Sequence, residues 1–130
     1  MDHLTLANNF NAFAYELVTN HSKINNEVKS IQDDIFLRRI VFSRYYYALY
    51  HKYLAHDDEL SSMSGSGLHA TVLEKIKCCG DPKLYQVYVK LRNLRIWADY
   101  QDTNHLALTV NLMTINTDVF SIIKRKQIKC

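Results

Sequence analysis

Residues 33–55 read DDIFLRRIVFSRYYYALYHKYLA, and this stretch decides the fold. It contains neither Gly nor Pro, and apolar residues such as Leu37 and Val41 recur at the three- and four-residue spacings of one helix face. Asp33 and Asp34 stand at its start, where acidic side chains stabilise a first helical turn. We therefore predict one long helix here, with its apolar face in the core of the protein.

The whole 130-residue chain shares this shortage of helix breakers, with only three Gly and one Pro. β-Sandwiches, β-barrels and Gly-rich phosphate-binding loops all need frequent turn residues, so the composition argues against them. Hydrophobic residues make up 48% of the chain and charged residues 22%, which is typical of a folded globular protein rather than a disordered one. The sequence predicts an all-α protein.

Apolar stripes and breakers elsewhere in the chain predict four more helices. Gly80 ends the third helix, and Asp81 followed by Pro82 opens the fourth with an N-cap and a first-turn proline. These four helices cover about residues 4–20, 68–77, 82 to between 97 and 100, and 105–124. About five helices with short connections predict an antiparallel bundle that forms a single domain over residues 1–130.

Two segments fall outside the predicted helices. Residues 56–67 combine three acidic residues, four serines and two glycines, so we predict a flexible loop. Residues 124–130 hold four basic side chains, which predict a basic tail whose cations lie in solvent or complement the preceding helix C-terminus. Residues 61–130 carry ten basic and five acidic side chains, a net +5, whereas residues 1–60 carry six basic and eight acidic, a net −2. We expect anionic ligands to bind the second half of the chain rather than the first.

The sequence lacks the signals of a membrane or secreted protein. No window reaches 18 apolar residues, and polar residues interrupt the N-terminal stretch where a signal peptide would be apolar. Cys78 and Cys79 are adjacent and Cys130 is distant, which matches neither a disulfide framework nor a metal-ligand spacing. We therefore expect a cytoplasmic protein that contacts no membrane and needs neither a metal nor a cofactor.

A first polar stripe lies within the long helix. Arg44, Tyr47 and His51 share one face because their spacings of three and four residues match the helical repeat. Arginine binds phosphate through its planar fork of donors, and histidine transfers protons near neutral pH. Arg44 and His51 are therefore candidate catalytic residues, and Tyr47 is a candidate RNA- or phosphate-binding residue.

A second polar stripe lies at the end of the fourth helix. Arg92, Arg95 and Asp99 follow the same helical spacing, and Tyr100 comes directly after them. Arg95 and Asp99 are candidate catalytic residues, and Arg92 and Tyr100 are candidate RNA- or phosphate-binding residues. The structural alternative is an ion pair that holds the helix end against its neighbour, or a buried network in which Asp99 pairs with Arg44.

Other polar and aromatic side chains have simpler interpretations. His69, at the predicted start of the third helix, is expected to be a surface or capping residue, and Trp97 is expected to pack between helices. The remaining histidines, among them His3, have no partner at metal-ligand spacing. Most of the nine tyrosines belong in the core or an interface, with their hydroxyls at its edge.

Together, the two stripes resemble a known family. Ser43–His51, SRYYYALYH, and Leu91–Tyr100, LRNLRIWADY, resemble the small prokaryotic HEPN proteins, whose second helix reads S-R-x-Y-Y-A-x-x-H and whose fourth ends in R-x-x-A-D-Y. The likeness covers roughly residues 36–123, with the motifs in the same order. It implies a helical bundle that forms a homodimer, with basic and polar side chains of both protomers lining a cleft at the interface.

The resemblance also implies a function. Many HEPN proteins are metal-independent ribonucleases, in which an Arg followed after four to six residues by His orients the scissile phosphate while the His assists attack by the ribose 2′-hydroxyl. In this chain Arg95 is followed by Asp99 and Tyr100 instead of His, whereas Arg44 and His51 have that spacing in the second helix. We expect a protein that acts on or binds RNA or nucleotides, as a ribonuclease toxin or an antiviral defence component.

Two alternatives stay open at this point. The chain can be a non-catalytic HEPN interaction module that binds a nucleotidyltransferase antitoxin, a CRISPR complex or another defence effector, which the missing His in the fourth helix favours. In one version of this alternative the partner nucleotidylates Tyr100. The second alternative is a small structural subunit of a larger complex. Cleavage of RNA without divalent metal would distinguish a ribonuclease from both.

Overall fold

The computed structural model describes residues 2–20, 31–100, 107 and 109–128. These residues form helices and no strand, so the all-α prediction is confirmed. The helices are α1 (His3–Thr19), α3 (Ile31–His56), α4 (Asp58–Ser61), α5 (Leu68–Cys78), α6 (Pro82–Tyr100) and α8 (Leu112–Ile123). Within the described residues the helices therefore number six rather than about five.

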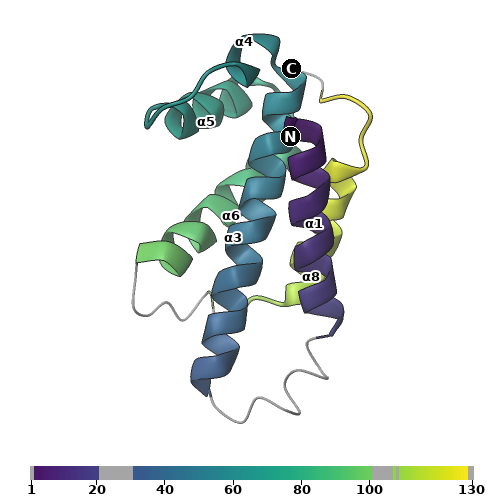
Figure 1. Ribbon diagram of the computed structural model, residues 1–130, viewed down its shortest axis with the longest axis vertical. Helices are drawn as coiled ribbons and strands as arrows, with labels where there is room; N and C mark the ends of the chain where they lie inside the picture. The colour runs from purple at the N-terminus through teal and green to yellow at the C-terminus, as the bar shows by residue number, and fades with distance from the viewer. Residues whose placement is uncertain (1, 21–30, 101–106, 108, 129–130) are drawn as a thin grey trace.

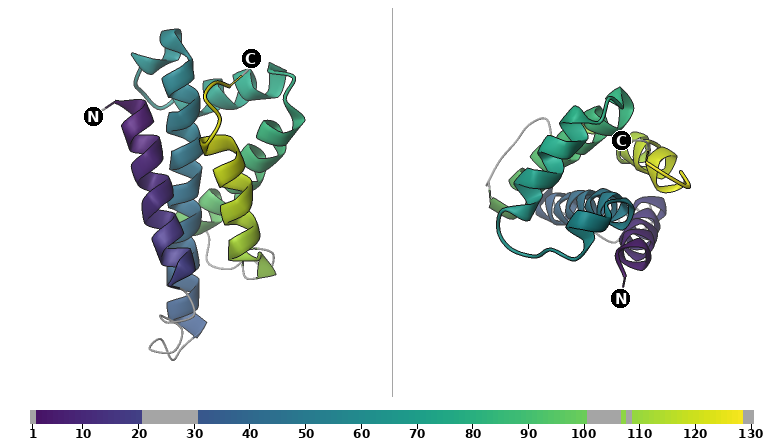
Figure 2. Two further views of the ribbon diagram at one scale, coloured as in Figure 1. Left: turned by 90° about the vertical axis from the view of Figure 1, so that its right-hand side faces the viewer. Right: turned by 90° about the horizontal axis from the view of Figure 1, so that it is seen from above.

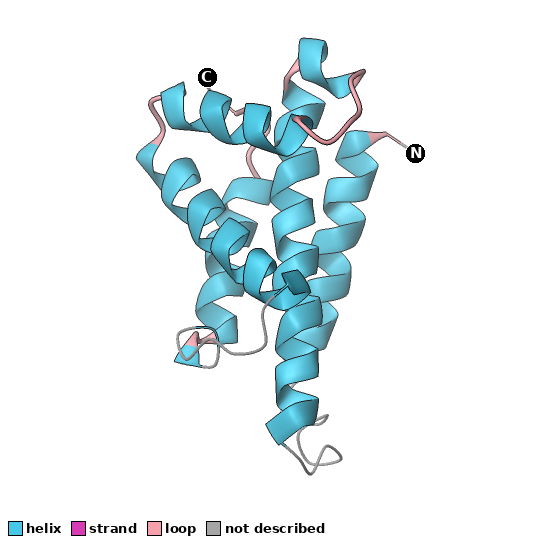
Figure 3. Cartoon of the chain, turned by 90° about the vertical axis from the view of Figure 1, so that its left-hand side faces the viewer, coloured by secondary structure: helices cyan, strands magenta, loops and turns pink. Residues whose placement is uncertain are grey.

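Four of the helices form an antiparallel bundle (Figure 1). Helices α1 and α6 run in one direction, α3 and α8 run in the other, and α4 and α5 lie at one end of the bundle (Figures 1 and 2). Helix α3 is the longest, at 26 residues, and packs against the other five. The C-terminal part of α6 leans across α3, as Figure 3 shows. Side chains of the two predicted polar stripes can therefore meet.

Capping residues set several helix boundaries. Asp2 accepts a 2.7 Å hydrogen bond from the Thr5 amide at the start of α1, and Asp81 accepts one of 3.1 Å from the Leu84 amide at the start of α6. Gly80 follows α5 with φ +77°, in the left-handed region that residues with a Cβ avoid. The helices predicted over about residues 4–20, over 68–77 and from residue 82 are confirmed as α1, α5 and α6.

The loop predicted over residues 56–67 is wrong for its first part, which contains the helical turn α4. The Asp57 side chain accepts a 3.0 Å hydrogen bond from the Leu60 amide and so caps this turn. Tyr53 from α3 and Lys75 from α5 also donate to Asp57, at 3.1 and 3.3 Å. An acidic residue that looked like part of a solvated loop thus joins three helices.

The last predicted helix is interrupted at residues 110–111. Of its first part the structure describes Ala107 and Thr109, which are helical, and residues 105, 106 and 108 lie outside the described residues. Helix α8 begins at Leu112, because the Asn111 backbone is extended and its side chain accepts a 3.1 Å hydrogen bond from the Thr114 amide. The apolar spacing of residues on either side of Asn111 hid this interruption. The predicted end near residue 124 is confirmed, since Lys124 is the C-cap.

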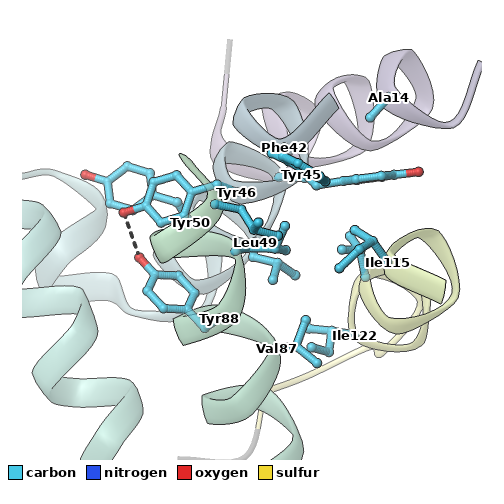
Figure 4. Close-up of a cluster of buried hydrophobic side chains, with 14 of the residues drawn as sticks. Ala14, Phe42, Tyr45, Tyr46, Leu49, Tyr50, Val87, Tyr88, Ile115 and Ile122 are labelled. Atoms are coloured by element: carbon cyan, nitrogen blue, oxygen red, sulfur yellow. Dashed lines mark hydrogen bonds between the residues drawn. The ribbon is translucent and has the colours of Figure 1, made fainter. Parts of the chain in front are cut away.

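The core is built on the tyrosine-rich face of α3 (Figure 4). Tyr45 and Tyr46 are at most 1% exposed and lie near apolar side chains of α6 and α8. Their hydroxyls have partners: Tyr45 donates to Asn116 Oδ1 at 2.5 Å, and Tyr88 donates to the Tyr46 hydroxyl at 3.2 Å. Tyrosine suits this core because its ring supplies buried apolar area and its hydroxyl finds a partner at the edge.

Two arginines of α3 bond backbone carbonyls at the end of α6 and just before α8. Arg39 Nη1 donates to the carbonyls of Trp97 and Ala98, both at 2.8 Å, which lie in the last turn of α6 where carbonyls lack intrahelical partners. Arg38 Nη1 donates to the Val110 carbonyl at 2.7 Å, just before α8. Trp97 is buried under the Arg39 guanidinium, so its predicted packing role is confirmed.

The basic tail predicted after α8 is tied down over residues 125–128. The Arg125 guanidinium pairs with Asp81, and Lys52 from α3 donates a 2.6 Å hydrogen bond to the Arg125 carbonyl. Ile128 is only 1% exposed. Burial of this apolar residue explains why the chain after α8 returns to the bundle in spite of its charge.

The structure bears on two further expectations, the absence of a membrane span and the state of the cysteines. Within the described ranges, no helix combines the length and apolar character that a membrane span needs. Cys78 is exposed with a free thiol, whereas Cys79 is disulfide-bonded. The spacing of the cysteines, which matches no disulfide framework, did not predict this bond, and the cysteines give no support for a reducing compartment.

The buried Tyr45–Asn116 pair provides a test of the core. Tyr45→Phe leaves the amide oxygen of Asn116 buried without this donor, so we expect the free energy of unfolding to fall by about 1–3 kcal/mol in a urea titration. Tyr85→Phe is the matched control, because Tyr85 is only partly buried and its hydroxyl bonds none of the described residues. Equal stability of Tyr45→Phe and wild type would contradict this role of the pair.

Candidate functional site

The two predicted polar stripes meet where α6 crosses α3. Arg95 Nη2 donates a 3.1 Å hydrogen bond to the Tyr47 hydroxyl. The guanidinium carbon also lies 5.3 Å from the ring centroid of Tyr46 and 5.5 Å from that of Tyr47, within the range of a cation–π interaction. The structure thus joins the stripes, which are 48 residues apart at this contact, into one site.

Asp99 orients Arg95 within this site. Arg95 Nε lies 2.9 Å from Asp99 Oδ2, one helical turn further along α6. The two side chains are 16% and 32% exposed, and the Arg95 Nε atom itself is buried, so the arginine side of the pair is shielded from water. Asp99 therefore pairs within its own stripe and not with Arg44, and its main effect is to fix the plane of the guanidinium.

His51 is held by two residues of α1. Its Nδ1 lies 2.8 Å from His3 Nδ1, and its ring is nearly parallel to that of Phe10, with centroids 5.7 Å apart. Burial lowers the pKa of His51 to about 4, and the charges that His3 and His69 can carry add to the effect. His51 is therefore neutral at pH 7, with one of its two ring nitrogens unprotonated.

His69 belongs to the same cluster, so its interpretation as a surface or capping residue is wrong. Its Nδ1 lies 2.7 Å from the Tyr46 hydroxyl, and its ring stacks on Tyr50 with centroids 4.2 Å apart. Burial, followed by the charges of Arg95 and Arg92, lowers the pKa of His69. A second neutral imidazole therefore faces the arginines of α6.

The other predicted site residues have distinct positions. The Arg44 guanidinium lies over the Phe10 ring, 5.6 Å from its centroid. Arg92 is near enough for its charge to help lower the pKa of His69 and to oppose the rise that burial causes in the pKa of Tyr46. The Tyr100 side chain lies outside the described part of the structure.

The assembled side chains suit a phosphodiester. The two stripes together hold three guanidinium groups, those of Arg44, Arg92 and Arg95, and one carboxylate, that of Asp99, so their net charge is positive. Guanidinium groups bind phosphate oxygens, and neutral imidazoles accept or relay protons. Among the described side chains, no three of the types His, Cys, Asp and Glu converge as a metal site.

Sequence reasoning missed His3, Phe10 and His69. His3 and His51 are 48 residues apart, and no spacing rule links a first-turn residue of one helix to the middle of another. For His69 one signal existed, because it stands beside the apolar positions Leu68 and Val72 of an amphipathic helix and so at the edge of the buried face.

Searches against protein-family models, curated proteins and solved structures found no match to this chain.

The lowered pKa of His51 predicts how stability depends on pH. The ordinary pKa of 6.5 applies to the unfolded chain and about 4 to the folded protein, so the unfolded state takes up the proton first. The contribution of His51 to stability is thus full above pH 6.5 and is lost as the pH falls toward 4. We expect the fall in Tm between pH 7 and pH 4.5 to be smaller for His51→Gln than for wild type.

His56→Gln is the control for this measurement, because His56 is exposed on the same helix. It should show the same fall in Tm as wild type, since carboxylates elsewhere contribute equally to all three proteins. An identical pH dependence in His51→Gln and wild type would show that His51 titrates normally.

Proposed function

We propose that this chain is an HEPN-like protein that binds RNA and cleaves it without a metal ion. The observation that carries the proposal is the contact of Arg95 with Tyr47 at 3.1 Å, in a cluster that includes two histidines. The rings of His51 and His69 have their centroids 6.4 and 6.0 Å from that of Tyr47. An arginine and two imidazoles thus surround one tyrosine.

Arg95 and Arg92 bind the phosphate in this proposal. The Asp99 carboxylate holds Nε of Arg95 at 2.9 Å, so the guanidinium is oriented before RNA arrives. Arg44, on the same face of α3 as Tyr47, adds charge along the path of the backbone. Because the attraction is electrostatic, RNA affinity falls as the salt concentration rises.

His51 accepts the proton of the ribose 2′-hydroxyl. The freed 2′-oxygen attacks the adjacent phosphorus, and the bond between phosphorus and the 5′-oxygen breaks. The proton taken up by His51 passes to the departing 5′-oxygen, so the protein ends unchanged. The products are a 2′,3′-cyclic phosphate and a 5′-hydroxyl, and neither a metal nor another reactant is consumed.

The position of His69 compensates for the histidine that the HEPN pattern has in its fourth helix and that this chain lacks there. That pattern places a histidine shortly after the arginine of the fourth helix, where this chain has Asp99. His69 from α5 lies close enough to Arg95 for the arginine charge to lower its pKa. An imidazole near Arg95 is thus supplied from another helix.

A second candidate function is a non-catalytic interaction module that binds a nucleotidyltransferase or a defence effector. The confinement of Arg95 favours this candidate, because its side chain is only 16% exposed and already contacts Asp99 and Tyr47. An arginine held on both sides can serve to fix the position of α6 on α3. The homodimer that the resemblance implies is compatible with both candidates.

RNA cleavage in the presence of EDTA tests the proposal. Wild-type protein is expected to cut RNA and leave 2′,3′-cyclic phosphate ends. His51→Gln should lower the cleavage rate by about 10²–10⁴-fold with little change in RNA affinity, because general acid–base catalysis contributes that much. Arg95→Ala should lower both the rate and the affinity, measured by fluorescence anisotropy with labelled RNA.

His56→Gln controls for the loss of a histidine from the same helix and should cut RNA at the wild-type rate. Cleavage by His51→Gln and Arg95→Ala at the wild-type rate would show that the site is assigned wrongly. Wild-type protein that cuts no RNA in EDTA would exclude the ribonuclease and leave the interaction module.

A further inference from the structure

A chain of hydrogen bonds runs from a backbone carbonyl through His3 to His51. The carbonyl oxygen of Ser61, the last residue of α4, lies 2.8 Å from His3 Nε2. The other ring nitrogen of His3, Nδ1, lies 2.8 Å from Nδ1 of His51. Three helices, α4, α1 and α3, therefore each contribute one group to the chain.

The two imidazoles meet edge to edge, as an N–H···N hydrogen bond requires. Their planes differ by 21° and their ring centroids are 5.0 Å apart, although the two nitrogens are only 2.8 Å apart. Rings stacked face to face could not bring two nitrogens so much closer than the centroids. The contact is therefore a hydrogen bond in the ring plane.

This network determines where the hydrogens lie. A carbonyl oxygen only accepts, so the hydrogen between His3 and Ser61 belongs to His3 Nε2. In its neutral form the His3 imidazole carries only this one N–H, which leaves Nδ1 as an acceptor. His51 must then donate from its own Nδ1, and the lone pair of His51 lies on Nε2.

We propose that His3 is a positioning residue that holds His51 in the tautomer whose Nε2 accepts the 2′-hydroxyl proton. This inference rests on the proposed function, because only the cleavage reaction needs a proton acceptor. A carboxylate or carbonyl that bonds one ring nitrogen of a catalytic histidine acts in the same way in other enzymes, by fixing both tautomer and ring orientation. Here a second histidine carries this effect from a carbonyl of α4 to α3.

The neighbouring histidine has the opposite tautomer. Tyr88 donates to the Tyr46 oxygen at 3.2 Å, so the one hydroxyl hydrogen of Tyr46 is left to bond His69 Nδ1 at 2.7 Å. The N–H of neutral His69 is then on Nε2. The site thus presents one imidazole as a proton acceptor and the other as a hydrogen-bond donor for the phosphate.

Tautomers are measured by long-range ¹H–¹⁵N NMR on the ¹⁵N-labelled full-length chain at pH 7.5. In wild type we expect the proton of His51 on Nδ1 and that of His69 on Nε2. His3→Phe keeps an aromatic ring but removes the acceptor, so the proton of His51 should no longer be confined to Nδ1. The rate of RNA cleavage should fall about 10–100-fold, as for other outer residues that orient a reactive histidine, with unchanged RNA affinity.

His3→Asn is the rescue variant, because its amide oxygen can accept the hydrogen bond from His51 Nδ1. It should restore the wild-type tautomer and most of the cleavage rate. A merely structural role of His3 would change the Tm of both variants without changing the tautomer of His51.

The outcomes separate this inference from the proposed function. Wild-type His51 protonated on Nε2 would overturn the inference, whatever the cleavage result. Equal cleavage by His3→Phe and an active wild type would overturn it as well. The expected tautomers in a wild type that cuts no RNA would support the hydrogen-bond relay and reject the ribonuclease.

Discussion

The structure depends on α3 remaining unbroken, because every other described helix packs against it. Its 26 residues extend over about 39 Å, enough for both ends of the bundle to rest on one rigid element. The buried side of α3 faces α6 and α8 through tyrosines. Arg39 bonds carbonyls in the last turn of α6, and Arg38 bonds a carbonyl just before α8. A break in its middle would displace the core and the polar site together.

The polar site lies where this core reaches the surface, and that position explains its electrostatics. Partial burial disfavours charged imidazoles, and the arginines nearby add to the effect at His69. The arginines keep their charge because a guanidinium is protonated at any ordinary pH. The fold thereby sets permanent cations beside neutral proton acceptors, a combination that neither solvent exposure nor full burial would produce.

Local signals explain how much of the fold and of the candidate site could be predicted from the sequence. Helix α6 begins directly after Asp81, and α5 ends shortly before Gly80. Caps act within one turn, so the sequence was sufficient at these two boundaries. The short helix α4 was missed because Asp57 stands among serines and glycines, and whether an aspartate caps a turn or lies in a loop depends on its neighbours in space. For the site, the spacing of Arg44 with His51 and of Arg95 with Asp99 was predictable, since residues three, four or seven apart share a helix face.

Most of the helices, and the face of each on which its polar residues lie, could thus be predicted from local sequence. The contacts of Arg95 with Tyr47 and of His3 with His51, and the position of His69 beside them, could not. The physical reason is that an α-helix is stabilised by hydrogen bonds between residues four apart, which the local sequence specifies. A contact between helices depends on how far one is rotated and shifted along another, and the packing of the whole core sets both.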